Sequence, residues 1–267
     1  MQGPRARGSK DAMPEPRVMI DEALHAGAEI ALSEAQARHA GTVLRLDVGD
    51  ALRPFNAHDG EWRARISAKS KRGMSIVLEA QLRPARAVPD LELLFAPLKR
   101  HATDLIIEKA TELGVRRIRP VITQRTIAET VRTDRLQNIA REAAEQTERF
   151  DAPEIFEALA LTKALDGWDA ARPLIYADER GEDENAAWGG ESGRAAPIAE
   201  IAGGMKAGRL ALLIGPEGGF TIEERRTLRG LAFVTPVSLG PRILRAETAV
   251  IAGLSVIQST WGDWRFA

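Results

Sequence analysis

The stretch LLIGPEGGFTIEE, residues 212–224, contains the clearest fold signal in the chain. An apolar run ends at Gly215, and Thr221 with Glu224 three positions later forms the T-x-x-E capping box of a helix start. A strand, a glycine-rich turn and a helix are therefore predicted in that order. In open α/β sheets such turns lie at the carboxyl edge, where small residues let main-chain groups reach a ligand. The stretch matches neither a Walker A loop nor G-x-G-x-x-G, so it does not predict a phosphate cradle.

A second stretch of the same kind, VSLGPRILRAETA at residues 237–249, follows closely. It again ends a strand in Gly-Pro, and it places Arg242, Arg245, Glu247 and Thr248 just before a helix. Two such strand ends can face one cleft. Each loop alone has a simpler interpretation: the first as a tight turn that reverses the chain, the second as a helix cap with an Arg-Glu pair, which contributes little when exposed.

Around these loops, apolar strands alternate with helical patterns, which predicts a mostly parallel sheet covered by helices. The predicted strands are 91–98, 116–123, 173–179, 209–215 and 233–240, and the predicted helices are 102–114, 134–150, 221–231 and 245–264. Residues 180–208 are rich in Gly, Ala and acids, which favours a mobile insertion with a short helix at 197–202.

The first third of the chain has a different pattern. Apolar and polar residues alternate in short runs over 41–82, separated by turn residues such as Asp59-Gly60, which predicts a small β-barrel. A short helix is expected after Ser33, its N-cap. Pro84 and Pro89 interrupt both periods, so we place the domain boundary near residue 87. The predicted parts are a disordered extension at 1–16, the barrel at 17–86 and the helix-covered sheet at 87–267.

Composition narrows the function. The 267 residues are 44% hydrophobic, contain no cysteine and only four histidines, so neither a disulfide framework nor a thiolate metal site is possible. Neither a signal peptide nor a membrane span is predicted, and we expect a cytoplasmic protein. The formal net charge is -1. Residues 115–149 nevertheless contain eight arginines against five acids, an excess that could contact phosphates; the alternative is an Arg-rich, solvated helix face.

Taken together, the two glycine-proline loops resemble the signature of the bacterial 16S ribosomal RNA uridine-N3 methyltransferases, members of the SPOUT superfamily. The stretches IIEKATELGVRRIRPVIT (106–123) and AREAAEQTERFDAPEI (140–155) resemble that family's other two blocks, in the same order. HAGTVLRLDVGDALRPFNAHDGEWRARI (39–66) resembles its PUA-like barrel. The resemblance spans about residues 17–267, and the sequence departs from it in the N-terminal extension and in the acidic segment 180–208.

The resemblance implies an α/β fold with a parallel sheet and a C-terminal trefoil knot, preceded by a small PUA-like β-barrel, in a homodimer. It also implies that the two loops hold S-adenosylmethionine in a bent shape, largely through backbone groups. The cofactor-binding residues implied in this way are Leu94, Phe95, Ile214, Gly215, Pro216, Glu217, Gly218, Leu239, Gly240, Ile243, Leu244, Thr248 and Ala249.

The implied reaction transfers the sulfonium methyl to N3 of a uridine in 16S ribosomal RNA, the family's U1498 near the decoding region, without a metal. Neutral N3 is a poor nucleophile, so a cation should favour its anionic form; Arg245 is the first candidate and Arg242 the second. Glu247 is a candidate proton acceptor, although a carboxylate beside arginines accepts protons weakly; it could instead orient Arg245 or cap the last helix.

Ribosomal RNA within the small subunit is the expected partner. The candidate RNA-binding residues are Arg63, Arg65, Lys69, Lys71, Arg72, Lys99, Arg100 and Arg125. Phosphate contacts position a substrate without specifying it. Two alternatives remain: a SPOUT methyltransferase acting on another rRNA or tRNA nucleotide, and a non-catalytic RNA-binding factor of ribosome assembly. A nucleotide-binding oxidoreductase would require a glycine fingerprint that the sequence lacks.

Overall fold

The computed structural model of the protein describes residues 15–70, 73–127, 131–182, 190, 192–206 and 208–266. The chain forms two compact units, Met1–Ala87 and Val88–Ala267, so their boundary along the sequence falls between Pro84 and Pro89. The predicted N-terminal extension lies outside the described residues, except for Glu15 and Pro16.

The first unit is a sheet with one short helical segment. Its elements are β1 (Arg17–Met19), β2 (Glu29–Ala31), α1 (Glu34–Arg38), the π-helix His39–Val43, β3 (Ala51–Asn56), β4 (Gly60–Lys69) and β5 (Met74–Arg83). Within its described residues the strand order is β1-β3-β4-β5-β2, with only the β1–β3 pair parallel. Ser33 caps α1 through a capping box with Gln36, which confirms the predicted helix start.

The second unit alternates strands and helices as the sequence predicts. Its elements are β6 (Asp90–Phe95), α2 (Arg100–Glu112), β7 (Arg117–Ile122), α3 (Thr133–Gln146), β8 (Glu154–Ile155), β9 (Leu159–Ala160), α4 (Leu161–Asp166), β10 (Leu174–Ala177), α5 (Ile198–Gly204), β11 (Arg209–Ile214), α6 (Ile222–Gly230), β12 (Val234–Val237), α7 (Ala246–Thr260) and the 3-10 helix Asp263–Phe266. The short elements β8, β9 and α4 were not predicted.

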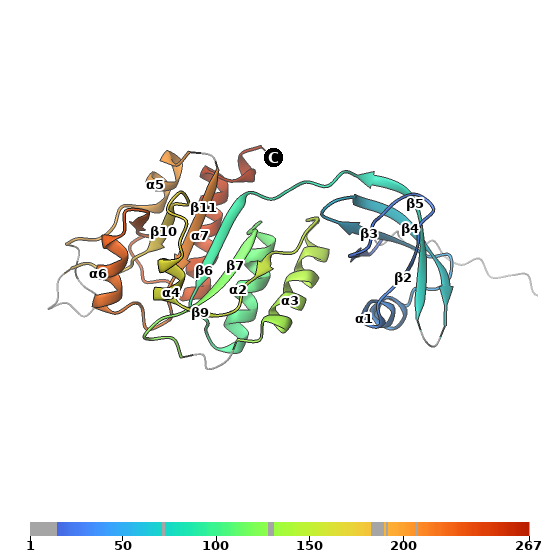
Figure 1. The fold of residues 1–267 in the computed structure, drawn as a ribbon, viewed down its shortest axis with the longest axis horizontal. Helices are drawn as coiled ribbons and strands as arrows, with labels where there is room; N and C mark the ends of the chain where they lie inside the picture. The colour runs from blue at the N-terminus through green and yellow to red at the C-terminus, as the bar shows by residue number, and fades with distance from the viewer. Residues whose placement is uncertain are drawn as a thin grey trace, which may run out of the picture. The chain divides into compact units, whose positions relative to one another are not determined.

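The sheet of the second unit is parallel and lies between two layers of helices (Figure 1). In the described part of the chain its order is β12-β10-β11-β6-β7-β8, and β9 pairs with β7. Alternate residues of each strand face opposite layers: Leu212 packs in the core shared with α2, α3, α5 and α7, whereas Leu213 packs in the core shared with α4 and α6. The apolar stripe of α7 (Val250, Leu254, Ile257 and Trp261) is buried.

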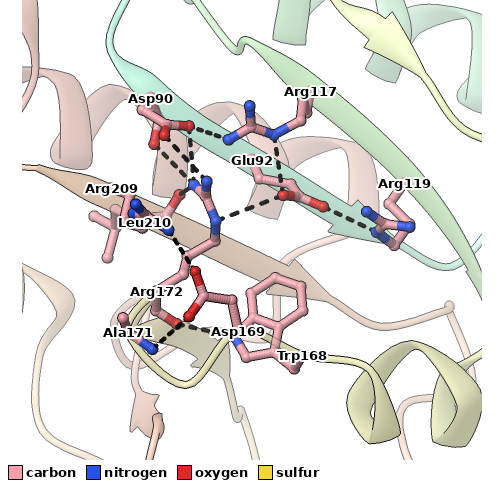
Figure 2. Close-up of polar contacts among 10 residues, drawn as sticks. All are labelled: Asp90, Glu92, Arg117, Arg119, Trp168, Asp169, Ala171, Arg172, Arg209 and Leu210. Atoms are coloured by element: carbon pink, nitrogen blue, oxygen red, sulfur yellow. Dashed lines mark hydrogen bonds and ion pairs between the residues drawn. The ribbon is translucent and has the colours of Figure 1, made fainter.

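A network of ion pairs lies at the amino ends of the central strands (Figure 2). Glu92 of β6 is 3% exposed, and its carboxylate accepts hydrogen bonds from Arg119 (2.9 Å) and Arg117 (3.3 Å) of β7. Asp90 pairs with Arg117 and with Arg172, which precedes β10. Because each charge has partners, this network fixes the lateral pairing of strands rather than presenting a free charged surface.

The acidic segment 180–208 is only partly described. Residues 183–189, 191 and 207 lie outside the described residues, but α5 confirms the short helix predicted there, with bounds of Ile198–Gly204. Ile198 and Ala202 are buried in the core beside α7, and a parallel bridge joins Pro197 to Ser238. The part of the segment from Pro197 through α5 is therefore packed onto the second unit. No helix in the described ranges has the length and apolar character needed to cross a membrane.

Candidate active site

A cavity of about 230 Å³ opens at the carboxyl ends of β10, β11 and β12. These are the positions at which parallel sheets bind ligands. Both glycine-proline loops contribute to its walls, so the prediction that they face one cleft is confirmed. The lining residues are Ala177, Asp178, Glu179, Ile214, Gly215, Pro216, Glu217, Gly219, Leu239, Gly240, Arg242, Ile243, Leu244, Arg245, Ala246 and Ala249.

The first loop, residues 215–221, is held by its own packing. A Cβ added to Gly215 would lie 2.5 Å from the ring of Phe220, and one added to Gly219 would lie 2.8 Å from Oε1 of Glu179. Gly219 also has φ +64°, the left-handed region that favours glycine. Thr221 and Glu224 form the predicted capping box of α6. Protein packing therefore already requires small residues in this loop, independently of any ligand.

The loop after β7 contacts the first loop from outside the cavity. Arg125 donates a hydrogen bond to the carbonyl of Gly218 (2.8 Å), and the backbone N–H of Gln124 donates to Oε1 of Glu224 (2.8 Å). The side chain of Arg125 also occupies the space beside Gly218, where a Cβ added to that glycine would lie 3.4 Å from it. Gly218 does not line the cavity, and these contacts fix the turn before α6.

The second loop, residues 238–245, supplies the charged rim. The Oγ of Ser238 accepts a hydrogen bond from the backbone N–H of Gly240 (3.2 Å), which has φ +109°. Arg245 is the N-cap residue of α7 but makes no side-chain cap. Arg242 and Arg245 are exposed, and among the described residues neither guanidinium makes a hydrogen bond or ion pair. Both cations are thus available at the cavity mouth.

Other predicted site residues lie beside the cavity rather than on its walls. Glu247 is half-buried in the first turn of α7, where a carboxylate suits the helix dipole, and Thr248 is exposed next to it. Leu94 and Phe95 are at most 1% exposed; they pack in the two cores on either face of β6. They support the sheet edge from within.

Two acids that follow β10 were not predicted as part of the site. Asp178 is 2% exposed, and its carboxylate accepts hydrogen bonds from Arg225 (2.8 and 3.1 Å) and Arg229 (2.8 Å) of α6. Its backbone N–H donates to the carbonyl of Val237, at the end of β12. Asp178 therefore ties together two strands and a helix around the cavity. Glu179 follows it and is half-buried on the cavity wall.

Two family models match the chain: an RNA methyltransferase domain over residues 86–258 and an RNA methyltransferase PUA domain over residues 32–79. A curated relative from Rickettsia conorii, ribosomal RNA small subunit methyltransferase E, is 33% identical over 91% of this chain and 94% of its own length. The chain belongs to the ribosomal RNA small subunit methyltransferase E family. A Synechocystis protein of the same name is 30% identical, with coverage of 87% and 73%.

Solved structures agree with this family. A methyltransferase from Legionella pneumophila, solved in complex with the bound cofactor SAM, has a TM-score of 0.80 and 29% identity, covering 94% of this chain and all of that one. The ribosomal RNA small subunit methyltransferase E of Neisseria gonorrhoeae, bound to S-adenosyl methionine, has a TM-score of 0.81 and 26% identity, with coverage of 95% and 100%. The α/β fold and the PUA domain expected from the sequence are thereby confirmed.

The candidate RNA-binding residues of the PUA unit lie on exposed strand positions. Arg63 pairs with Glu15 (3.6 Å), and Arg65 pairs with Glu79 (2.7 Å). Lys69 donates a hydrogen bond to the carbonyl of Leu46. Lys71 and Arg72 lie outside the described residues.

In the methyltransferase unit, Lys99 and Arg100 are exposed at the start of α2. The arginines of 115–149 mostly have protein partners. Arg149 follows the end of α3; its side chain is buried and donates hydrogen bonds to the carbonyls of Thr111 and Val115. Much of the local excess of arginine therefore stabilises the fold.

Proposed function

We propose that this chain transfers a methyl group from S-adenosylmethionine to N3 of a uridine in 16S ribosomal RNA, the family's U1498. Family membership supports small-subunit ribosomal RNA as the substrate. The observation on which the proposal chiefly rests is the cavity itself: two glycine-proline strand ends form its walls, and two guanidinium groups without a partner among the described residues lie at its mouth.

The residues of the cavity fit S-adenosylmethionine. Ile214, Leu239 and Leu244 offer apolar walls for an adenine ring. Gly215 and Gly240 leave main-chain groups accessible beside them. Charged side chains line the same cavity, as an amino acid with both a carboxylate and an ammonium group requires. When bound, the cofactor supplies a methyl group on a positively charged sulfur, which a nucleophile can displace.

The protein's own contribution is to hold and orient the reactants. The first loop is fixed by packing against Phe220 and Arg125, so it can position the donor without further ordering of its chain; such positioning can lower a barrier by about 7–11 kcal/mol in favourable cases. Arg245 and Arg242 stabilise the negative charge that develops on the uracil ring when N3 loses its proton. A guanidinium remains charged at any physiological pH.

We further propose, from the family resemblance, that the enzyme acts in the cytoplasm as a homodimer. Light scattering of the purified chain, expected at twice 29.1 kDa, tests the dimer. The exposed basic residues of β4 and the start of α2 would contact phosphates of the substrate, which predicts an affinity for RNA that falls steeply with salt.

The decisive assay uses small ribosomal subunits from a strain that lacks the modification, incubated with a radiolabelled methyl donor. Methylation at N3 blocks Watson-Crick pairing, so reverse transcription should stop beside the labelled uridine. Label on a carbon or a ribose oxygen, or on another RNA, would refute the N3 assignment. Binding of subunits without any label transfer would favour the non-catalytic alternative.

Arg245→Ala separates chemistry from cofactor binding. We expect the rate to fall by about 100-fold or more, the usual cost of removing a group that stabilises developing charge, while the affinity for S-adenosylmethionine changes little. Arg226→Ala is the matched control, because Arg226 is exposed on α6 and does not line the cavity. Equal losses of rate and of affinity in Arg245→Ala would assign Arg245 to cofactor binding instead.

A further inference from the structure

Glu179 is an acidic side chain of the cavity to which neither the fold nor the proposed chemistry gives a role. It follows β10 directly and is half-buried on the cavity wall. Its Oε1 lies so close to Gly219 that a Cβ there would be 2.8 Å away. The neighbouring Asp178 accepts the hydrogen bonds of Arg225 and Arg229. Among the described residues, no other side chain donates to the carboxylate of Glu179.

The surroundings make a negative charge on Glu179 costly in the free protein. Burial raises the pKa of its carboxyl group, and the charge of Asp178 raises it further, whereas Arg225 and Arg180 act in the opposite direction. Within its own segment, Glu179 is faced by Tyr176, Asp178 and Arg180. From other segments it is faced by Arg225 of α6 and by Arg194, which donates to the backbone carbonyl of Glu179. The charged residues on the other cavity walls are Glu217, Arg242 and Arg245. A cation bound in the cavity would offset this cost.

We propose that Glu179 binds a positively charged group of the methyl donor. This inference rests on the proposed function and adds to it the acidic residue that contacts the cofactor. S-adenosylmethionine has two positive groups, the sulfonium and the ammonium of its methionine part, and one carboxylate. Glu179 and the guanidinium groups of Arg242 and Arg245 line one cavity from different strand ends, which suits a ligand with charges of both signs. Glu217 is exposed and is the weaker candidate, because water already solvates its charge.

The contact couples cofactor binding to a proton. A bound cation lowers the pKa of Glu179 from its raised value in the free protein, so binding releases a proton wherever the free carboxyl group is protonated. The affinity therefore rises with pH through the free-state pKa, which lies above the ordinary 4.5, and levels off once the free carboxyl group is ionised. A ribose hydroxyl, which is neutral, would lower this pKa less than a cation does, because it offers one hydrogen bond and no charge.

Isothermal titration calorimetry in two buffers of different ionisation enthalpy measures both the affinity and the protons released. The wild type, Glu179→Gln, Glu179→Asp and the control Glu223→Gln are titrated with S-adenosylmethionine and with S-adenosylhomocysteine at several mildly acidic pH values. Glu223 is exposed in the first turn of α6 and does not line the cavity. Thermal melting without ligand verifies that each variant is folded.

We expect Glu179→Gln to weaken S-adenosylmethionine at least about tenfold, equal to about 1.4 kcal/mol, and to abolish the proton release, while Glu179→Asp retains the release and Glu223→Gln behaves as wild type. A loss confined to S-adenosylmethionine assigns the contact to the sulfonium, and an equal loss for both ligands assigns it to the ammonium. Unchanged affinity in Glu179→Gln, or wild-type binding without proton release, overturns the inference about Glu179 but leaves the proposed function standing. A folded wild type that binds neither ligand refutes the proposed function as well.

Discussion

Gly215→Ala is predicted to disturb the cavity through one steric contact. The added Cβ would lie 2.5, 2.9 and 3.1 Å from three ring carbons of Phe220, whereas non-bonded carbons prefer about 3.5–4.0 Å. The ring must therefore move by about 1 Å, but Phe220 is 2% exposed and packs edge-on against Tyr176, with ring centroids 5.1 Å apart. Overpacking of this kind costs about 1–3 kcal/mol.

The assay compares Gly215→Ala with Gly230→Ala. Gly230 ends α6, and its added Cβ would meet nothing within 4 Å, so this change should be neutral or stabilise the protein by up to about 1 kcal/mol. Urea unfolding followed by circular dichroism gives the free energy of unfolding, and calorimetry gives the affinity for S-adenosylmethionine. We expect only Gly215→Ala to lose stability and to bind the cofactor at least about tenfold more weakly, because its loop backbone shifts.

A double variant tests the stated cause. Gly215→Ala combined with Phe220→Leu should recover part of the loss, with a coupling of about 0.5–3 kcal/mol, since the smaller side chain leaves room for the methyl group. If Gly215→Ala matches Gly230→Ala in both stability and affinity, the claim that Phe220 holds the loop in place is refuted.

Two further predictions concern charges. Asp178→Asn should lower the free energy of unfolding by about 3 kcal/mol or more, because it leaves Arg225 and Arg229 without their buried counter-charge. The control Asp169→Asn, which breaks an exposed pair with Arg209, should cost at most about 1 kcal/mol in the same urea titration. Equal losses in the two variants would contradict the argument. The N–H of Leu24 holds the pKa of Asp59 below its ordinary 3.8, so its contribution to stability is full above that value and disappears as the pH falls through the lower folded-state pKa. Acid unfolding of Asp59→Asn should therefore depend less on pH in this range, and an unchanged dependence would show that the bond does not matter.

The sequence was sufficient to predict most of the framework because local signals agree with the fold. The capping boxes at Ser33 and Thr221 give the starts of their helices, and Gly114, the last residue of the predicted helix 102–114, has φ +73° and lies just beyond the end of α2. The glycine-proline pairs give the two loops that share the cavity. Each of these signals depends on residues a few positions apart, so no tertiary contact is needed to interpret it.

The charged contacts could not be predicted because they depend on strand order and register. Glu92 and Arg119 are far apart in the chain and meet only because β6 and β7 are neighbours. Asp178 and Glu179 differ little in sequence context, and the acidic segment that follows them suggests a solvated loop; the structure gives them different surroundings. The glycines of the first loop were interpreted as room for a ligand, whereas Phe220 and Arg125 fill part of that room. The trefoil knot, the homodimer and the cytoplasmic location stay predictions.

A crystal structure of the protein grown with S-adenosylmethionine tests the central claim most directly. We predict that the cofactor lies in the cavity between residues 215–219 and 239–245, with a positively charged group within hydrogen-bonding or ion-pair distance of Glu179. A cofactor bound at another place on the chain, with this cavity left to solvent, would contradict the account.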